Sequence, residues 1–345
     1  MKESNTARWQ SPSNIALIKY WGKKGFQLPS NASISFTLNA CNTTTLLRWI
    51  KKDAVISGED VQIRVLLDGI PAPSFEPKIT SFFNKIKVEH PELEKFRFEI
   101  ETSNTFPHSS GIASSASGMS ALALCVCSML EELGGKFDFY QHASHLARIG
   151  SGSASRSVYG GVAMWGVHEA YAGSSDLFAI PIKDIHDNFQ QFNDVVLLVH
   201  EGQKSVSSTV GHGLLKDHPL AKKRFQLAQE NMAKMKTILQ EGNIDNFVEL
   251  IEHEALMLHS LMMTSSPSFI LMLPNTLAII KKIREDRKQN GGHITFTLDA
   301  GANVHMLFPN KDEAQAMNLV KNQLVGFCSN GRYICDKIGQ GPKKL

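Results

Sequence analysis

The sequence lacks the cysteine patterns that staple small or extracellular domains. Its 345 residues include five cysteines, an odd number with no pair of Cys-x-x-Cys motifs: Cys41, Cys125, Cys127, Cys328 and Cys335. Neither a disulfide framework nor a structural zinc site is therefore predicted, and a reducing compartment fits best.

Long apolar runs are also missing from the sequence. No segment approaches the 18 consecutive apolar residues that cross a membrane. Residues 1–10, MKESNTARWQ, contain no apolar signal core. We therefore expect a cytoplasmic protein that neither spans nor binds a membrane.

Blocks of like charge are missing too. Charged residues make up 20% of the chain, the formal net charge is +3, and the lysines are scattered. A nucleic-acid footprint needs basic residues gathered on one surface, so no nucleic-acid partner is predicted. A small anionic substrate is compatible with this charge, and neither internal repeats nor low-complexity tracts occur.

What the sequence does contain is 42% hydrophobic residues, arranged in alternating strand-like and helix-like segments. We expect strands at 14–20, 33–38, 43–50, 61–67, 159–167, 194–200, 293–298, 304–308 and 332–335. We expect helices at 81–90, 118–135, 138–149, 214–261, 276–289 and 311–325. This mixture predicts an α+β protein with two lobes, 1–190 and 191–345.

The segment PHSSGIASSASGMSALAL, residues 107–124, places small residues directly before a predicted helix. Ser114, Ser115 and Ser117 fall in its first turn. The unpaired N–H groups and the positive dipole of a helix start, with hydroxyls beside them, can bind a phosphate. Serines at a helix start are also ordinary caps. No Gly-Lys-Ser/Thr follows, so the segment is not a Walker loop.

A second candidate is GSGSASRS, residues 150–157. It places Ser151, Ser153 and Arg156 together on a predicted turn. The planar guanidinium of arginine suits two-point contact with a carboxylate or phosphate. A surface turn with a solvated arginine explains the segment equally well, so both interpretations remain.

A third candidate is TFTLDAGANVHML, residues 295–307. Asp299 stands where an apolar strand ends, and a carboxylate at that position can project into a cleft as a general base. Asp and Gly between two strands are also what a plain hairpin needs. Without further context, the hairpin is the simpler interpretation.

The fourth candidate is SPSNIALIKYWGKK, residues 11–24, which gathers cations and aromatic residues behind an apolar run. If 14–20 is a strand, Lys19 and Tyr20 point to opposite faces of its sheet. Lysine is a compact charge that suits flexible phosphates. A solvated strand end is the alternative, although it explains the apolar neighbours poorly.

A histidine-containing segment, HEALMLH at 253–259, carries no such chemistry. Its histidines lack the spacing that a zinc-binding helix requires. We therefore expect an ordinary helix surface there.

Five segments together resemble, in order, the motif set of the diphosphomevalonate decarboxylase family, within the GHMP kinase superfamily. They are NIALIKYWGK, LPSNASISFTL, FPHSSGIASSASG, GSGSASRSVYGG and FTLDAGAN, and the resemblance covers residues 11–309. It implies a two-lobed GHMP kinase fold with a mixed α/β N-terminal lobe and a ferredoxin-like C-terminal lobe. It also implies ATP and Mg²⁺ as cofactors and a homodimer.

The implied reaction belongs to the mevalonate pathway of isoprenoid biosynthesis. ATP phosphorylates the 3-hydroxyl of mevalonate 5-diphosphate, and loss of phosphate and CO₂ gives isopentenyl diphosphate. A tertiary alcohol leaves poorly as hydroxide, so the phosphate ester lets the C3–O bond break as the carboxylate gives up its electrons. Phosphoryl transfer asks mainly for positioning and electrostatics.

The resemblance also assigns site residues. It implies that Asp299 is the catalytic aspartate, that Arg156 holds the substrate carboxylate and that Lys19 lies near the reacting centre. The substrate diphosphate would contact Tyr20, Lys23, Ser151, Gly152, Ser153 and Ser208. The nucleotide would contact Ser103, Pro107, Gly111, Ala113, Ser114, Ser115 and Lys204. Magnesium would bridge the ATP phosphates with few protein ligands.

The chain departs from the family in a few places. At Thr209 some bacterial relatives carry an arginine that grips the diphosphate, so its absence leaves room for a monophosphate substrate. Ala302 and residues 108–110 also differ, but neither change removes a chemical group. Alternatives are a phosphomevalonate decarboxylase, a mevalonate 3-kinase-like enzyme and a non-catalytic ligand sensor. The presence of Asp299 and Lys19 favours the full reaction.

Overall fold

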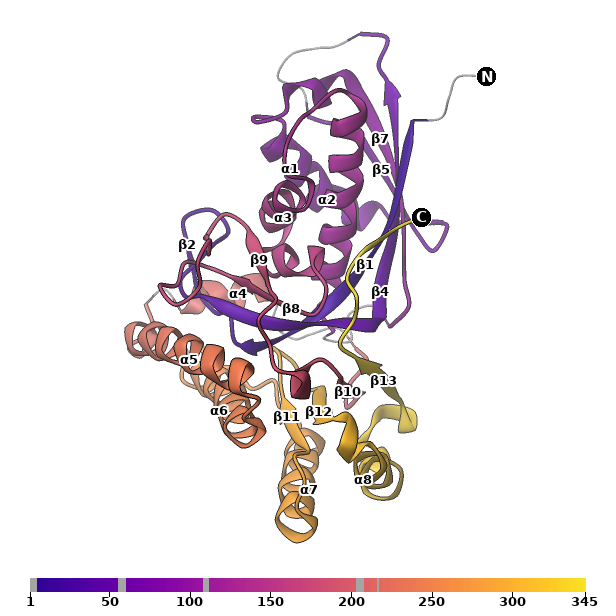
Figure 1. Cartoon of the computed structure of the whole chain (residues 1–345). Coiled ribbons are helices and arrows are strands. Elements are labelled where there is room, and N and C mark those ends of the chain that lie inside the picture. Colours follow the sequence, from indigo (N-terminus) through magenta and orange to yellow (C-terminus); the bar gives the residue numbers. More distant parts are fainter. Residues whose placement is uncertain (1–4, 55–59, 108–111, 203–207, 216) are drawn as a thin grey trace.

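Two lobes make up the chain, each built around its own β-sheet (Figure 1). The structure is a computed structural model, and it describes residues 5–54, 60–107, 112–202, 208–215 and 217–345. The first lobe contains an eight-stranded sheet and the second a four-stranded antiparallel sheet. This is the α+β architecture expected from the alternation of segments.

The sheet of the first lobe has the order β14-β1-β4-β7-β5-β6, with β8 beside β4 and β9 beside β8. Its strands are β1 Thr6–Ile18, β4 Ser33–Lys51, β5 Ile63–Leu67, β6 Ile70–Pro71, β7 Phe96–Asn104, β8 Val162–Trp165, β9 Ala179–Ile182 and β14 Lys343–Lys344. A small hairpin pairs β2 Lys23–Lys24 with β3 Leu28–Pro29. Three helices cover one face of the sheet (Figure 1): α1 Glu76–Ile86, α2 Ser114–Glu132 and α3 Phe139–Gly150.

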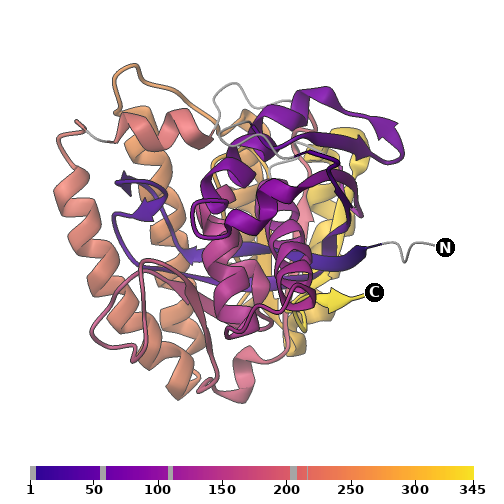
Figure 2. The same ribbon diagram turned by 90° about the horizontal axis from the view of Figure 1, so that it is seen from above.

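The second lobe has the sheet order β11-β12-β10-β13. Its strands are β10 Phe192–Leu197, β11 Thr295–Thr297, β12 Val304–Pro309 and β13 Tyr333–Lys337. Its helices are α4 Ser208–Leu214, α5 Ala221–Glu241, α6 Ile244–Met263, α7 Pro274–Asn290 and α8 Glu313–Leu319, the last continuing as a π-helix over Val320–Leu324. Figure 2, seen from above, shows α5 and α6 side by side at one flank of the molecule.

The expected strands 33–38 and 43–50 are in fact one long strand, β4. The Asp336 carboxylate accepts the main-chain N–H groups of Asn39, Ala40 and Cys41 at 2.7–2.9 Å. These contacts satisfy the backbone where the strand passes a bulge, so the polar residues that suggested a turn do not make one.

The expected helix 214–261 is in fact two helices, α5 and α6, and Leu214 at its start is the last residue of α4. Gly242 adopts a left-handed conformation with φ 74° and ends α5. Asn243 then begins α6, its side chain accepting the N–H of Asn246. A glycine in this conformation stops a helix at no steric cost, which helical periodicity alone does not reveal.

Six strands, β2, β3, β6, β7, β9 and β14, are absent from the sequence-based expectations. The strand expected at 14–20 begins earlier, at Thr6, and the helix expected at 81–90 also begins earlier, at Glu76. Strand β7 lies in the middle of the first sheet, paired antiparallel with β4 and parallel with β5. Its first six residues, FRFEIE, alternate strictly between apolar and charged side chains, and Phe96, Phe98 and Ile100 are buried. The period-2 signal of a strand was therefore present in the sequence and was overlooked.

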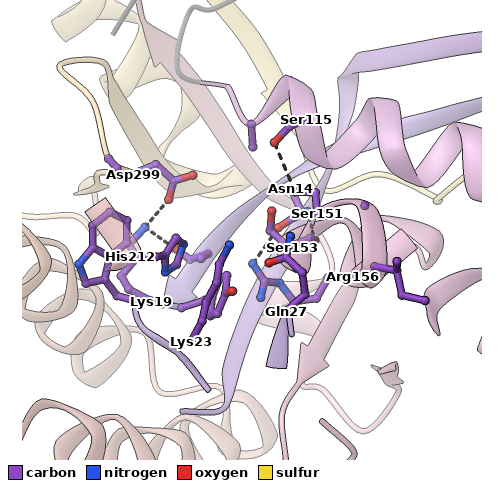
Figure 3. A pocket seen from close by; sticks show the side chains of 18 of the residues that line it. Asn14, Lys19, Lys23, Gln27, Ser115, Ser151, Ser153, Arg156, His212 and Asp299 are labelled. Carbon is purple, nitrogen blue, oxygen red and sulfur yellow. Dashed lines mark hydrogen bonds and ion pairs between the residues drawn. The ribbon is translucent and has the colours of Figure 1, made fainter. Parts of the chain in front are cut away.

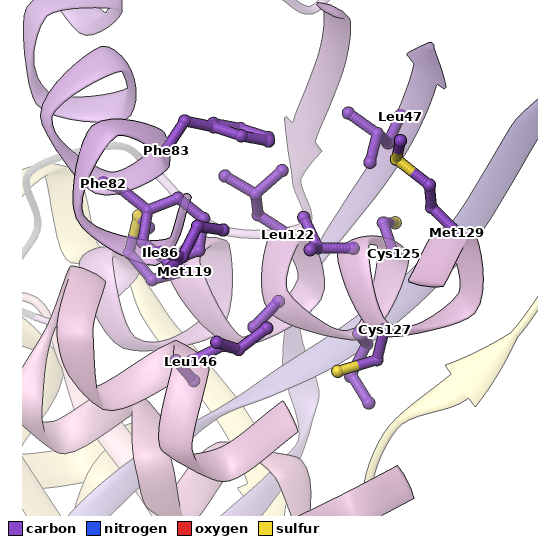
Figure 4. Packing of buried hydrophobic residues seen from close by; sticks show 14 of the residues in the cluster. Leu47, Phe82, Phe83, Ile86, Met119, Leu122, Cys125, Cys127, Met129 and Leu146 are labelled. Atoms are coloured by element: carbon purple, nitrogen blue, oxygen red, sulfur yellow. The ribbon is translucent and has the colours of Figure 1, made fainter. Parts of the chain in front are cut away.

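Helix α2 is the centre of the first lobe's core (Figure 4). It packs against β1, β4 and α3, with Leu122, Cys125 and Met129 fully or almost fully buried. By length and composition α2 could cross a membrane, the single such helix in the described ranges, but most of it is buried within the protein. It is therefore a core helix of the folded chain.

A second core cluster joins the two lobes. Ile15 and Phe36 of the first sheet share it with Phe192 and Phe247 of the second lobe, and Phe36 stacks on Phe247 with ring centroids 5.8 Å apart. The C-terminal strand β14 also returns to pair with β1. Both features attach the second lobe firmly to the first and hold the cleft between them.

Candidate active site

A cavity of about 360 Å³ lies where the two lobes meet. It is lined by the end of β1, the β2–β3 hairpin, α1, the start of α2, the 3₁₀-helix η3 Gly152–Val158, α4 and the turn at Asp299 and Ala300. Figure 3 shows Asp299 and Lys19 on one side of this cavity and Ser151, Ser153 and Arg156 on the other. All four segments that were ambiguous in the sequence therefore meet in one place.

Asp299 and Lys19 form an ion pair with Nζ 3.1 Å from Oδ1. The lysine side chain is 2% exposed and the aspartate side chain 27% exposed, so the carboxylate faces the cavity from a buried partner. Burial lowers the pKa of Lys19, while Asp299 and then Glu254 oppose that effect. Asp299 does lie in a hairpin connection, between the antiparallel strands β11 and β12, and this connection also brings its carboxylate to the cavity.

The sequence-based expectation for Lys19 and Tyr20 was also wrong. Strand β1 ends at Ile18, so the alternation of faces stops before Lys19. Lys19, Tyr20, Trp21 and Lys23 consequently all line the cavity. The Tyr20 hydroxyl is buried and has no hydrogen-bond partner among the described residues. Burial raises its pKa, so the hydroxyl remains a donor available to a ligand.

Arg156 is 2% exposed and is held entirely by neutral groups. Its guanidinium donates to Ser35 Oγ at 2.9 Å, to Ser33 Oγ at 2.5 Å and to Asn14 Oδ1 at 3.2 Å. No ion pair to Arg156 occurs among the described residues, and burial lowers its pKa to about 10. A buried cation without a carboxylate partner is costly, so the arrangement favours an anionic ligand in the cavity.

The cavity is strongly basic. Of the described residues that line it, five are cationic and one is acidic: Lys19, Lys23, Lys78, Lys85 and Arg156 against Asp299. Burial, and then the neighbouring Lys78, lower the pKa of Lys23. Arg148 anchors the hairpin that carries Lys23 by donating to the Phe26 carbonyl at 3.2 Å. Such an excess of cations favours a ligand with several negative charges.

Gly152 has no room for a side chain. A Cβ there would lie 2.7 Å from the Trp165 ring and 2.9 Å from the Tyr20 hydroxyl. Ser151 and Ser153 flank it and line the cavity, and Ser151 Oγ lies 3.4 Å from Ser115 Oγ. The segment is thus a tightly packed wall, where the sequence also allowed a surface turn.

A second cavity of about 310 Å³ opens beside the first. Its walls are mainly apolar and include Leu67, Phe75, Ile79, Ile100, Met119 and Leu122. Polar side chains that line it include Thr43, Thr45, Thr102 and Asn104. Lys78 and Ser115 line both cavities. The start of α2, at Ser114, lies between them, and Ala113 before it has the unusual φ of 45° with no side-chain cap.

Other residues named from the sequence are placed differently. Ser103 and Pro107 line neither cavity, and Ser103 alternates in β7 with Thr102 and Asn104, which do. Gly111 and Lys204 lie outside the described residues. Ser208 is the first residue of α4, and its side chain also lies outside the description.

Several lining residues were missed in the sequence. Lys78, Ser81, Phe82 and Lys85 follow helical spacing i, i+3, i+4, i+7 on α1, which a helix start at Glu76 would have revealed. His212 of α4 packs between the rings of Tyr20 and Trp21 and accepts the Gly22 N–H at Nδ1. Burial, and then Lys23, lower the pKa of His212 to about 3, so it is a neutral group.

The segment 253–259 is not the ordinary helix surface that was expected. Glu254 is fully buried and His259 is 1% exposed. Glu254 pairs with Arg224 at 2.6 Å, and His259 Nε2 lies 3.0 Å from the Asp299 carbonyl oxygen. Both therefore lie directly behind the Lys19–Asp299 pair.

The described residues contain no group of three or more His, Cys, Asp or Glu side chains that could hold a metal ion. Asp299 is the only carboxylate among the described residues that line the main cavity. A divalent cation there would depend mostly on ligand oxygens and water, which is how Mg²⁺ usually accompanies nucleotides.

The architecture and the site define the class of protein: a two-lobed enzyme of the GHMP kinase fold, with an anion-binding cleft between its lobes. The chain belongs to the diphosphomevalonate decarboxylase family. Residues 11–178 match the Diphosphomevalonate decarboxylase-like N-terminal domain, and residues 194–344 match the Mevalonate 5-diphosphate decarboxylase C-terminal domain.

Curated relatives agree with this family. The diphosphomevalonate decarboxylase of Schizosaccharomyces pombe is 26% identical over 352 residues, covering 96% of this chain and 85% of the relative. That of Saccharomyces cerevisiae is 28% identical over 328 residues, covering 90% and 79%.

Solved structures share the whole fold. Mevalonate diphosphate decarboxylase from Staphylococcus aureus superposes with a TM-score of 0.84 at 29% identity, covering 99% of this chain and 98% of that one. A structure described as MDDEF in complex with MVAPP, AMPPCP and magnesium has a TM-score of 0.82 at 28% identity, with the same coverage. The expected GHMP kinase fold is confirmed by these neighbours.

Proposed function

We propose that this protein is an ATP-dependent diphosphomevalonate decarboxylase, a lyase that converts mevalonate 5-diphosphate and ATP into isopentenyl diphosphate, ADP, phosphate and CO₂. The observation that carries the proposal is that Asp299, Lys19 and the unpaired Arg156 line one cavity between the lobes. A six-carbon hydroxy acid needs a carboxylate of the protein beside its hydroxyl group and a guanidinium beside its own carboxylate.

The substrate would lie in the main cavity with its ends in different surroundings. Arg156, already oriented by Ser33, Ser35 and Asn14, would hold the substrate carboxylate without reorganising. The diphosphate would be bound by Lys23, the Tyr20 hydroxyl and the wall at 151–153. The 3-hydroxyl would then lie near Asp299.

ATP would occupy the second cavity and reach into the first. The apolar walls of the second cavity fit the flat adenine ring, and the polar side chains that line the cavity supply hydrogen-bonding groups. The start of α2 at Ser114 and Ser115 offers main-chain N–H groups and a positive dipole to the phosphates. Lys78, which lines both cavities, is placed to contact a phosphate chain that runs between them.

The reaction would begin with phosphoryl transfer to the 3-hydroxyl. Asp299 accepts or orients its proton, and the ammonium of Lys19 lies 3.1 Å from the carboxylate and holds it in place. The C3–O bond then breaks with its electron pair on the phosphate, and the electrons of the bond to the carboxylate form the new C2–C3 double bond. Buried cations offset the charge that the departing phosphate carries.

Magnesium supplies charge neutralisation on the ATP phosphates when bound. Asp299 and the Ser115 hydroxyl are the oxygen groups near the expected phosphates that could contribute to holding it. Most of its remaining ligands would be phosphate oxygens and water.

The test follows ADP together with labelled CO₂ from mevalonate 5-diphosphate that carries the label in its carboxyl carbon. We expect equal amounts of the two products. Asp299→Asn should lower both rates by about 10²–10⁴-fold, as loss of a general base does, with little change in the dissociation constants of substrate and nucleotide. ADP without CO₂ would instead identify a kinase, and no turnover would favour a ligand-binding protein.

A monophosphate substrate is the second candidate, because Thr209 offers no cation where some relatives have arginine. Lys23, Lys78 and Lys85 favour the diphosphate, since they add positive charge that one phosphate would not need. Comparing kcat/KM for mevalonate 5-phosphate and mevalonate 5-diphosphate decides between them.

A cytoplasmic location and a homodimeric assembly remain predictions. The first is supported by the unpaired cysteines, all of which are free in the structure, and the second by the family resemblance. Light scattering after gel filtration measures the assembly, and fractionation of the source cells measures the location.

A further inference from the structure

We propose that the buried residues Glu254 and Arg224 are positioning residues for catalysis, because they clamp the main chain of Lys19 and so set where its ammonium meets Asp299. This inference rests on the proposed function. It goes beyond it in assigning a role to two residues that do not touch the substrate cavity.

The clamp holds both polar groups of the Lys19 main chain. The Lys19 N–H donates to Glu254 Oε2 at 2.9 Å, and Arg224 Nη2 donates to the Lys19 carbonyl at 3.0 Å. The same two side chains bind each other through two hydrogen bonds of 2.7 and 2.6 Å. Four hydrogen bonds thus join the Lys19 main chain, Glu254 and Arg224 in a ring, and two of them form the bidentate ion pair between Glu254 and Arg224.

The ring is buried and reinforced. Glu254 is 0% exposed and Arg224 is 2% exposed. Asn231 donates to Glu254 Oε1 at 2.7 Å, and Asn31 donates to the Lys19 carbonyl at 3.0 Å. Although burial opposes its ionisation, Arg224 lowers the pKa of Glu254, so the clamp stays charged.

Helix α6 also reaches the other partner of the catalytic pair. His259, five residues after Glu254, contacts the Asp299 carbonyl oxygen through Nε2 at 3.0 Å. One rigid helix therefore contacts the main chain at both Lys19 and Asp299. This arrangement explains how two residues 280 positions apart in sequence keep a separation of 3.1 Å.

Simple stability is a weak explanation for such a pair, because buried ion pairs often contribute little net stability. The same helix offers a comparison in Glu252, which is 4% exposed and binds Arg284 and Arg287 at 2.9 and 2.7 Å. The Glu252 carboxylate accepts hydrogen bonds from Arg284, Arg287 and the Thr295 hydroxyl. It is therefore a matched buried charge away from the site.

The experiment compares Glu254→Gln with Glu252→Gln in the full-length enzyme. We expect Glu254→Gln to lower kcat about 10–100-fold with substrate and nucleotide dissociation constants within about threefold of wild type. Glu252→Gln should leave kcat within about twofold of wild type, even if it lowers the melting temperature as much as Glu254→Gln does. Asn231→Leu removes a hydrogen bond to Glu254 without removing a charge, and it should lower kcat by a smaller factor. This variant replaces Glu254→Gln in the experiment if Glu254→Gln does not fold.

A double-mutant cycle separates positioning from structure. If Glu254 acts through Lys19, adding Glu254→Gln to Lys19→Arg should change kcat much less than it does in the wild type. A purely structural role predicts that the two effects multiply. Full multiplication, or a Glu254→Gln enzyme with wild-type kcat, overturns the inference.

The pH profile supplies a second readout. The charged and titratable groups that face Lys19 are Asp299 from the β11–β12 turn, Glu254 from α6, Arg224 from α5, Arg156 from η3 and His305 from β12, which pairs with Asp194. Removing the Glu254 charge should lower the pKa of Lys19 further, so kcat should begin to fall at lower pH than in the wild type. An unchanged profile counts against the proposal. Absence of turnover in the wild type itself would instead refute the proposed function.

Discussion

At the scale of single residues, the cleft buries positive charge that the described protein groups do not fully neutralise. Arg156 is held by two serines and an asparagine, so its orientation is set while its charge is still available. Lys19 differs, because it already has Asp299 as a partner. The contacts of Arg156 suit a residue that binds an anionic ligand, and those of Lys19 suit a residue that holds the Asp299 carboxylate.

Arg156→Lys should therefore be far from conservative. A single ammonium cannot reproduce three fixed donor contacts and a two-point grip on a carboxylate. We expect kcat/KM for the decarboxylation substrate to fall about 10–100-fold, equivalent to about 1.4–2.8 kcal/mol. Steady-state kinetics measure the loss, and a rate near that of the wild type would contradict the role of the guanidinium.

A histidine outside the cleft should make folding sensitive to acid. Burial, and then His90 and His145, lower the pKa of His142 to about 4. The neutral His142 contributes its full stabilisation above pH 6.5, which is about the pKa of a histidine in the unfolded chain. This contribution is lost as the pH falls toward 4, because the unfolded chain then binds a proton that the folded protein does not. The melting temperature should fall less between pH 7 and 5 in His142→Gln than in the wild type.

The exposed His253 supplies the control for that measurement. His253→Gln should follow the wild-type curve over the same range, because its side chain is exposed on the surface of α6. Identical curves for His142→Gln and the wild type would show that His142 does not govern the acid limb.

At the scale of elements, helix α2 serves both the core and the ligand. Its middle is buried against the sheet, whereas its first turn at Ser114 and Ser115 faces the two cavities. Gly118, one turn further on, lines the second cavity, and a Cβ there would meet nothing within 4 Å. This glycine leaves open the space in which we place the nucleotide base.

Gly118→Leu should fill that space from a helix that tolerates the change. We expect the dissociation constant for ATP to rise at least about tenfold, because even one misplaced apolar side chain in a pocket costs on the order of 1–3 kcal/mol. The affinity for the phosphorylated mevalonate should change little. Calorimetric titration with each ligand separately measures both effects.

Gly118→Ala is the matched control, since it adds one methyl group in open space. It should raise the free energy of unfolding by about 0.5–1 kcal/mol through the higher helix propensity of alanine, with ATP binding nearly unchanged. Strong ATP binding by Gly118→Leu would mean that the nucleotide lies elsewhere.

At the scale of the whole molecule, the two lobes share one core cluster. Ile15 and Phe36 pack with Phe192 and Phe247, and β14 joins the last residues to the first strand. The active-site cleft therefore lies between parts that are tied together beneath it. Separating the lobes would expose this apolar surface to water.

The chain should accordingly unfold in a single transition. Tryptophan fluorescence, which reports mainly the first lobe, and far-UV circular dichroism, which reports both, should give coincident urea curves. All four tryptophans, Trp9, Trp21, Trp49 and Trp165, lie in the N-terminal half of the sequence. Two separated transitions would show that the lobes are independent.

Much of the fold could be predicted from local pattern. Apolar runs, helix periodicity and glycine stops identified most strands and helices, and the order of five motifs identified the family. Errors arose where a tertiary contact replaced a local signal. Asp336 keeps β4 extended through Asn39 and Ala40, where polar residues suggested a turn. The omission of β7 had no such cause, because its residues FRFEIE alternate between apolar and charged side chains.

The sequence by itself determined which chemical groups were available: an aspartate after a strand, an arginine in a serine-rich turn, and a lysine after β1. Tertiary structure alone decided that these groups share one cavity, that Lys78 and His212 join them, and that Glu254 lies behind Lys19. The physical reason is that burial and pairing depend on contacts between segments up to 280 residues apart. Local spacing specifies the period of a helix or strand, and it carries no information about which distant charge that element will meet.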